Sequence, residues 1–430
     1  MWNVQILSTE TIKPSSPSPN LATVKLSLLD QLAPRIYVHL VLFYSDDDSC
    51  RSQAQRSHHL KTSLSQTLTR FYPLAGRIHG NTHIECNDSG VDFVEARVEG
   101  RLSEFLLSPD IDAVSNFLPC DASRTRSGRD VLLAVQANFF DCGGAAVGVG
   151  ISHKIADGAS FSAFISGWAT AARGRSEIAP PTFDAAAHFP PREAPEPNDI
   201  VAVEEYCNVA TKRFVFDAPK IAALRAVNGG KRAVAWPTRV EAVSALIWRC
   251  MMRSRGAEAS ARVSVALQAV NLRPRMAPPL PEHSFGNLMS GALAAADGED
   301  RKSWLEKKMR DAIERAGADH HIRRLQGADG VEESVGRFRA LGEMYGERGY
   351  DFCIFSSWCR FPLYEADFGW GRPDWVSQGR NQLRNSIVLM GTRSGGGMEA
   401  WVCLGKEDMA RFEKDEELLS FSSVPSIAAP

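Results

Sequence analysis

A histidine and an aspartate four residues apart form the first candidate for chemistry in this 430-residue chain. His153 and Asp157 stand in the segment His-Lys-Ile-Ala-Asp-Gly, between a β-favouring apolar run and an amphipathic helical pattern. Histidine titrates near neutral pH, so it can take a proton from a hydroxyl or an amine as that group attacks. Asp157 can orient the imidazole as the acid of a triad does, or it can leave the site and form a structural ion pair. The spacing alone does not separate a catalytic histidine from an ordinary one near a helix start.

The segment Asp-Phe-Gly-Trp-Gly, residues 367–371, is the second candidate. Two glycines around an aromatic residue predict a tight backbone path with a fixed ring. By composition alone, a structural turn with a packed Trp370 is the simpler interpretation.

The third candidate is Asn-Leu-Arg-Pro-Arg, residues 271–275, which ends a strand-like run. Two arginines at a strand end, Arg273 and Arg275, can bind phosphate oxygens in a bidentate manner. One of them can equally pair with Asp157 or with Asp367. The residue types favour an ion pair over a ligand role.

Several other chemistries lack their sequence signatures. The chain has no GxSxG elbow, no GxxxxGK[ST] loop and no HExxH, and position 153 is a histidine where a GxGxxG fingerprint needs glycine. A serine hydrolase of that type, a P-loop protein and the common zinc enzymes therefore have no support. We predict no metal site.

Alternating strands and helices must position these residues. Leucines 60, 64 and 68 recur every four residues and predict a helix, as does the pattern from Phe161 to Trp168. Thr238 and Glu241 have the spacing of a capping box at a helix start. Further helices are predicted over about 301–316 and 406–417. The predicted strands are apolar or alternating runs: Tyr37–Tyr44, Val131–Phe140, Ala146–Ser152, Arg213–Asp217, Val263–Val270, Phe352–Phe355, Ile387–Met390 and Ala400–Leu404.

A proline-rich stretch divides the chain into two halves. The segment Ile178–Asp199 has little periodic apolar pattern and is expected to be extended. We therefore predict an α/β protein of two similar-sized domains, residues 1–180 and 211–430, joined by a crossover at 181–210.

Charge, hydropathy and cysteine content limit the kinds of partner and the location that we expect for the protein. Lys plus Arg number 49 and Asp plus Glu number 51, so the net charge is −2 and bulk binding to nucleic acid is not expected. No window approaches about 18 apolar residues, and no secretory signal pattern opens the chain, so we expect no membrane association. Nine scattered cysteines without a CxxC pair are typical of buried thiols in a reducing compartment. A cytoplasmic location is expected.

Taken together, HxxxDG in the first half and DFGWG in the second resemble the plant BAHD acyl-CoA-dependent acyltransferases. The likeness extends over nearly the whole chain and includes KLSLLDQLAP at 25–34, LSQTLTRFYPLAGRI at 64–78 and NLRPRMAPPLPEHSFGNL at 271–288. The segments are most similar to the branch that acetylates alkaloid and terpenoid alcohols. The resemblance implies two domains like chloramphenicol acetyltransferase, with a channel between them that reaches His153 from both faces.

The resemblance also implies roles for individual residues. His153 is expected to be the general base, Asp157 to serve positioning with Arg273 as partner, and the Trp370 indole N–H to be a candidate donor to an oxyanion. Asp367, Gly369 and Gly371 are expected to be mostly structural. By family position, the candidates for contact with acyl-CoA are Asn271, Arg273, Arg275, Ser284 and Asn287.

The expected reaction is transfer of an acyl group, acetyl first, from acyl-CoA to the hydroxyl of a plant specialised metabolite, without an acyl-enzyme. Amide formation on an amine, an aromatic or longer acyl group, and a non-catalytic metabolite- or CoA-binding protein stay open as alternatives. No permanently bound cofactor is expected, and the chain is expected to act as a monomer.

Overall fold

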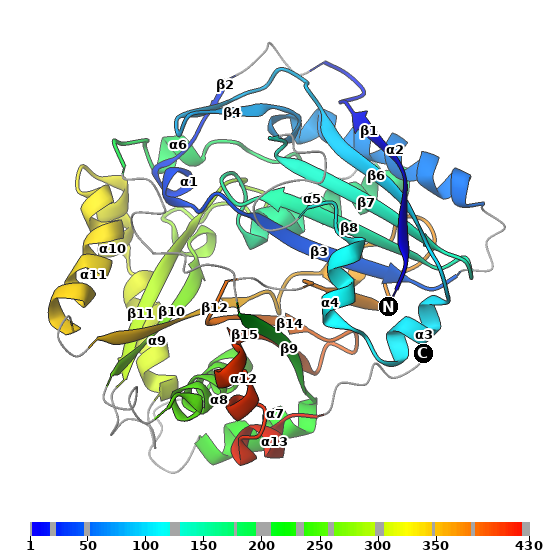
Figure 1. The fold of residues 1–430 in the computed structure, drawn as a ribbon. Helices are drawn as coiled ribbons and strands as arrows, with labels where there is room; N and C mark the ends of the chain where they lie inside the picture. Colours follow the sequence, from blue (N-terminus) through cyan, green and yellow to red (C-terminus); the bar gives the residue numbers. More distant parts are fainter. Residues whose placement is uncertain are drawn as a thin grey trace.

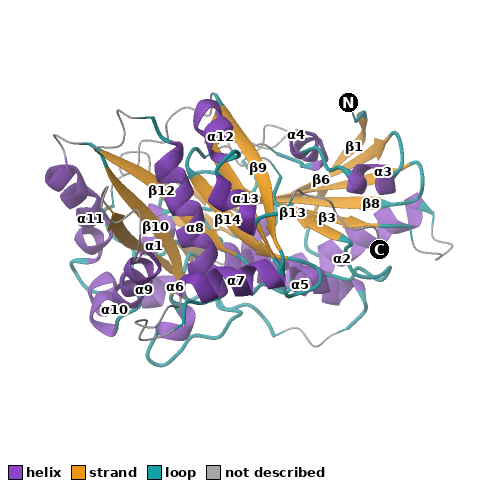
Figure 2. Cartoon of the chain, turned by 90° about the horizontal axis from the view of Figure 1, so that it is seen from below, coloured by secondary structure: helices purple, strands orange, loops and turns teal. Residues whose placement is uncertain are grey.

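The computed structural model describes residues 2–17, 23–46, 52–120, 130–175, 179–194, 208–228, 236–256, 262–296, 305–345, 349–379 and 383–423, without the side chains of 337–338 and 341–345. Within these ranges the chain builds two six-stranded mixed sheets and one small three-stranded sheet. In Figure 2 the two large sheets lie side by side across the molecule.

The first large sheet comes almost entirely from the first half of the chain (Figure 1). All its pairs are antiparallel except β6 with β7. Its strands, in spatial order, are β1 (Val4–Ile12), β6 (Val91–Val98), β7 (Leu133–Phe140), β8 (Ala145–Ser152), β3 (Tyr37–Tyr44) and β13 (Trp375–Ser377).

The second large sheet belongs to the second half. Strand β12 lies parallel to both of its neighbours, and the outer pairs are antiparallel. Its strands, in spatial order, are β11 (Met289–Ala296), β10 (Val263–Asn271), β12 (Tyr350–Ser357), β14 (Ser386–Gly391), β15 (Met398–Gly405) and β9 (Val209–Phe216). The small sheet consists of β2 (Thr23–Lys25), β5 (His83–Glu85) and β4 (Arg77–His79).

Helices pack on the large sheets around two main apolar cores, and the first core also includes Val388, Met390 and Trp401 of the second sheet. Leu60, Leu64 and Leu68 of α2 are buried in the first core, and Val243 and Ile247 of α8 are buried in the second. The helices are α1 (Leu28–Leu32), α2 (Gln53–Arg70), α3 (Leu102–Leu107), α4 (Ile111–Val114), α5 (Gly158–Ala172), α6 (Ala185–His188), α7 (Ala218–Asn228), α8 (Arg239–Ser254), α9 (Leu305–Ala316), α10 (Asp319–Gln326), α11 (Gly330–Tyr345), α12 (Lys406–Phe412) and α13 (Glu416–Phe421). Among the described residues, no helix is both long enough and apolar enough to span a bilayer.

Strand β13 connects the two halves. It follows the DFGWG segment of the second half but pairs with β3 of the first sheet, through Trp375 with Phe43 and Val376 with Leu42. The Trp375 ring stacks on Phe43 at 5.1 Å and on Trp401 of the second sheet at 5.9 Å. One short strand thus links the first sheet to the second.

Most of the predicted helices and strands are present in the structure, with local corrections. Thr238 and Glu241 form the expected capping box of α8. The single helix expected over 406–417 is two helices, because the Asp415 side chain accepts the N–H groups of Glu417 and Leu418 and starts α13 there. The proline-rich segment is not wholly extended, since it contains the short helix α6, and its part beyond Ala194 lies outside the described residues.

Candidate active site

The HxxxD segment is a single turn between β8 and α5. Strand β8 ends at Ser152, and the His153 N–H donates to the Ile36 carbonyl at 2.8 Å. Asp157 is the N-cap of α5, where its Oδ1 accepts the Ser160 N–H at 2.8 Å. Aspartate is favoured at this position because it satisfies a backbone donor that the first turn of a helix leaves free. The spacing therefore places the histidine at a strand end and the aspartate at a helix start.

Asp157 forms the structural ion pair that the sequence left as one alternative. The Arg273 Nη1 and Nη2 donate to its two carboxylate oxygens at 2.8 and 3.1 Å, and the Leu288 N–H donates to Oδ2 at 3.1 Å. Both side chains are buried. Burial opposes ionisation, but Arg273 and the N–H groups of Ser160 and Leu288 outweigh it and hold the pKa of Asp157 below its ordinary value. Asp157 therefore ties the start of α5 to the second half.

His153 hydrogen-bonds a residue of the second half. Its Nδ1 lies 3.1 Å from Oδ1 of Asn287, whose Nδ2 donates to the His153 carbonyl at 2.7 Å. The Asn287 Nδ2 and backbone N–H also donate to Oδ1 of Asp30, at 2.9 and 2.8 Å. His153 thus lies where the two halves meet.

The environment of His153 favours the neutral imidazole. The side chain is partly exposed, yet protein surrounds most of it, and this burial lowers its pKa below the ordinary value. A hydrogen bond to its own backbone, the carboxylates of Asp157 and Asp30, and Asn287 act in the opposite direction but do not cancel the effect. A neutral, solvent-reachable imidazole is available as a base at neutral pH.

Lys154, the residue after His153, holds helix α1 in place. Its ammonium is buried and donates to the carbonyls of Asp30, Gln31 and Ala33 at 2.7, 2.8 and 3.2 Å. These carbonyls lie at the end of α1, where a helix leaves backbone acceptors free and favours a cation. Lys154 and Asp30 are site residues that our sequence analysis missed. The Ser27–Asp30 spacing, which forms a capping box in the structure, is the signal that could have drawn attention to Asp30.

The structure does not bring Trp370 to His153. The Trp370 ring packs 6.2 Å from Tyr44, at the opposite end of β3 from Tyr37, which pairs with Ser152. Seven residues of strand span roughly 23 Å at about 3.3 Å each. An oxyanion donor must come within about 3 Å. The assignment of Trp370 as that donor is therefore wrong: the ring fills a packing site between β3 and α2, under the Arg56 guanidinium.

The rest of the DFGWG segment is a backbone turn. Oδ1 of Asp367 accepts the N–H groups of Gly369 and Gly371 at 2.7 and 3.0 Å. Both glycines have positive φ, 100° and 98°, which side chains other than glycine rarely adopt. Phe368 packs 4.7 Å from Trp168 of α5. The segment therefore docks the start of β13 onto the first half.

The five residues proposed to contact acyl-CoA divide into two groups. Arg273, Ser284 and Asn287 are each 1% exposed and bonded to protein partners, so the structure corrects them from ligand contacts to parts of the scaffold. Asn271 and Arg275 are exposed. The Arg275 Nη1 donates to the Asn271 carbonyl at 2.8 Å, and both partial burial and the nearby Arg360 guanidinium lower the pKa of Arg275. Of the two arginines, only Arg275 is exposed enough to meet an anion.

Comparison with known proteins shows the family of the chain. The model of the Transferase family matches residues 2–419. The chain is 41% identical to vinorine synthase of Rauvolfia serpentina, over 94% of both chains. It is 40% identical to stemmadenine O-acetyltransferase of Catharanthus roseus, over 96% of both. The crystal structure of vinorine synthase superimposes with a TM-score of 0.84 and covers 98% of each chain.

A more distant structure shares the fold. A protein of F. sporotrichioides, crystallised with coenzyme A and T-2, has a TM-score of 0.72 at 20% identity and covers 93% of this chain. The match over residues 2–419, together with relatives above 30% identity over almost the whole length, shows that the chain is an acyltransferase and belongs to the BAHD branch of the Transferase family.

Proposed function

We propose that the protein transfers an acetyl group from acetyl-CoA to a hydroxyl of an alkaloid or terpenoid alcohol, with His153 as the general base. The single observation that carries this proposal is the partly exposed imidazole of His153 where the two halves meet, hydrogen-bonded at its Nδ1 to Asn287. Burial lowers its pKa, which favours the neutral form that a base needs. The names of the relatives, which include acetyltransferases of stemmadenine and of limonoids, support the choice of donor and acceptor.

The proposed chemistry uses one base and no acyl-enzyme. His153 removes the proton of the acceptor hydroxyl as its oxygen attacks the thioester carbonyl. The carbon–sulfur bond then breaks, and the imidazolium returns the proton to the CoA sulfur, so the enzyme is regenerated. General-base catalysis of this kind contributes about 10²–10⁴-fold to the rate. Asp157 takes no part in proton transfer, because its carboxylate is engaged by Arg273.

Arg275 and Arg360 are our candidates for the phosphates of CoA. Both side chains are exposed, and the Arg360 charge acts on the Arg275 guanidinium. Two guanidinium groups close together repel each other, and an anion between them relieves that repulsion through charge-assisted hydrogen bonds.

The test is acceptor-dependent release of CoA thiol, measured with acetyl-CoA and a panel of alkaloid and terpenoid alcohols. His153→Ala should lower kcat by about 10²–10⁴-fold, while the exposed His320→Ala serves as the matched control and keeps full activity. Undiminished turnover in His153→Ala would overturn the general-base role. Activity with benzoyl-CoA or with an amine, but not with acetyl-CoA and alcohols, would overturn the proposed donor or acceptor.

The same assay tests the CoA contact. Arg275→Gln should raise the KM for acyl-CoA about tenfold, because it removes one charge-assisted hydrogen bond to the donor. The KM for the acceptor should not change. Arg372→Gln is the control, since this exposed arginine pairs with Glu365. Equal changes in both KM values would contradict the assignment of Arg275.

A further inference from the structure

We propose that Asp30 is a positioning residue: through the amide of Asn287 it fixes the His153 tautomer whose Nε2 is free to accept a proton. The inference rests on the proposed function of His153 as the base. It concerns a residue of helix α1, which reaches His153 only through Asn287.

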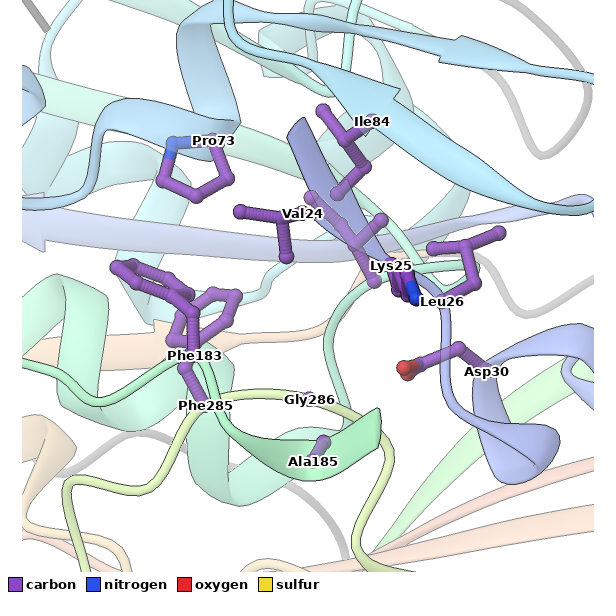
Figure 3. A pocket seen from close by; sticks show the side chains of 11 residues that line it. Val24, Lys25, Leu26, Asp30, Pro73, Ile84, Phe183, Ala185, Phe285 and Gly286 are labelled. Atoms are coloured by element: carbon purple, nitrogen blue, oxygen red, sulfur yellow. The ribbon is translucent and has the colours of Figure 1, made fainter. Parts of the chain in front are cut away.

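The Asp30 carboxylate is buried and fully engaged. Its Oδ2 accepts the N–H and the hydroxyl of Ser27 at 2.9 and 2.7 Å, which closes the capping box of α1. Its Oδ1 accepts both N–H groups from Asn287, the backbone one at 2.8 Å and the side-chain one at 2.9 Å. Figure 3 shows Asp30 extending from α1 toward Gly286, the residue before Asn287, at the edge of a small apolar recess.

These bonds determine which way the Asn287 amide faces. Both hydrogens of its Nδ2 have acceptors, Oδ1 of Asp30 and the backbone carbonyl of His153. If the amide were reversed, its oxygen would face a carboxylate and a carbonyl, and three acceptors would meet without a proton. The network therefore assigns the amide oxygen to the side of the His153 ring.

The direction of the amide then determines the tautomer. An amide oxygen only accepts hydrogen bonds, so the Nδ1 atom 3.1 Å from it must carry the hydrogen. A neutral imidazole has one N–H, and Nε2 is left with the lone pair. With the amide reversed, its N–H would compete for the Nδ1 lone pair, and only the hydrogen bond of the ring to its own backbone would still favour a hydrogen on Nδ1. A proton on Nε2 would prevent that atom from acting as a base.

Asp30 also supplies a negative charge near the ring. It is one of the groups that raise the pKa of His153 against the stronger effect of burial. Asp157 has a larger effect in the same direction, although Arg273 pairs with it. The nearby Lys154 ammonium is held by the Asp30 carbonyl. When His153 takes a proton, Asp30 stabilises the imidazolium through the same Asn287 amide.

The test is Asp30→Asn, which keeps the shape of the side chain and removes its charge. We expect kcat to fall about 10- to 100-fold with both KM values within about twofold of wild type, in line with loss of an outer-shell partner of a functional histidine. The acid limb of the kcat/KM profile should move to lower pH, because a group that raises the His153 pKa is lost. A fall in kcat without a shift of the acid limb of the pH profile would overturn the proposal, because it would indicate that Asp30 has only a structural role.

Glu241→Gln is the matched control. Glu241 holds the same capping-box position at the start of α8, where it bonds Thr238 and Arg310, so the same loss of a carboxylate occurs outside the site. This variant should lose thermal stability and keep both kcat and the acid limb of wild type.

The tautomer can be observed directly in the wild-type enzyme. The chain has ten histidines, so the ¹⁵N signals of His153 are assigned as those missing from His153→Ala in histidine-labelled protein. Above its pKa, the His153 ring should show a protonated Nδ1 and an unprotonated Nε2. A protonated Nε2 would overturn the inference even if Asp30→Asn failed to fold. The two proposals can fail separately. If His153→Ala loses activity while Asp30→Asn keeps the wild-type kcat, the acid limb of its pH profile and its tautomer, only the role of Asp30 is wrong. If His153→Ala stays active, the proposed function itself is wrong.

Discussion

The protonation state of His153 connects the geometry of the site to a measurable pH dependence. Burial lowers its pKa from the ordinary value of about 6.5. Because a general base must be unprotonated, a lowered pKa extends activity to more acidic solution. We expect the acid limb of kcat/KM to have its midpoint below pH 6.5, measured by thiol release in buffers of constant ionic strength. A midpoint above 6.5 would contradict the influence that we assign to burial.

At the residue scale, spacing by itself predicts roles only where the chemistry is local, and Arg273 was expected as the partner of Asp157, 116 residues away, only through the family resemblance. His153 and Asp157 stand four residues apart, so their pattern could be recognised. Asn287, the partner of the His153 ring, is 134 residues away, and no spacing predicts such a contact. Trp370 shows the opposite error: an indole N–H is a plausible donor, but only the register of β3 reveals that its ring lies at the far end of the strand.

At the level of elements, the ion pair between Asp157 and Arg273 joins the start of α5 to the turn after β10. Removing only the cation leaves a buried carboxylate uncompensated, so Arg273→Met should cost about 3–5 kcal/mol of unfolding free energy. Adding Asp157→Asn removes that charge, and the double variant should be more stable than Arg273→Met alone. Urea unfolding of both single variants and the double variant measures this coupling.

The control for this set of single and double variants is the exposed ion pair of Asp319 and Arg323 on α10. The equivalent substitutions there should change the unfolding free energy by less than about 1 kcal/mol, because exposed ion pairs are screened by water. If the losses of unfolding free energy in the Asp157 and Arg273 single variants simply add up in the double variant, the two side chains do not stabilise each other.

Helices and strands differ in how far a sequence predicts them. Strand β3 is an apolar run within a sheet covered on both faces, and its limits were predicted correctly. The capping box of α8 is equally local. Strand β13 has only three residues, and its place beside β3 depends on a segment far away in the chain, since Trp375 pairs with Phe43, so neither length nor pattern indicates it. The pattern over 406–417 predicts a single helix, although Asp415 is of a residue type favoured at an N-cap and starts a second helix there.

For the whole molecule, the contacts of Trp375 predict how the two halves unfold. Its ring is 1% exposed and lies between Phe43 of the first sheet and Trp401 of the second, with the Arg213 guanidinium 5.1 Å from its centre. Trp375→Ala should cost about 3–5 kcal/mol and separate a single thermal transition into two, measured by differential scanning calorimetry. Trp236→Ala, at a side chain that is 59% exposed, should leave the transition unchanged. One cooperative transition in Trp375→Ala would show that other contacts couple the halves.

Strand β13 also has a consequence for the traffic of substrates. To move apart, the two halves would have to separate β13 from β3 or Trp375 from Trp401. If the proposed function holds, the acceptor alcohol and acyl-CoA would have to reach His153 while the two halves stay in contact. The fixed shape of the protein around His153, rather than a hinge between the halves, would then decide which alcohols react.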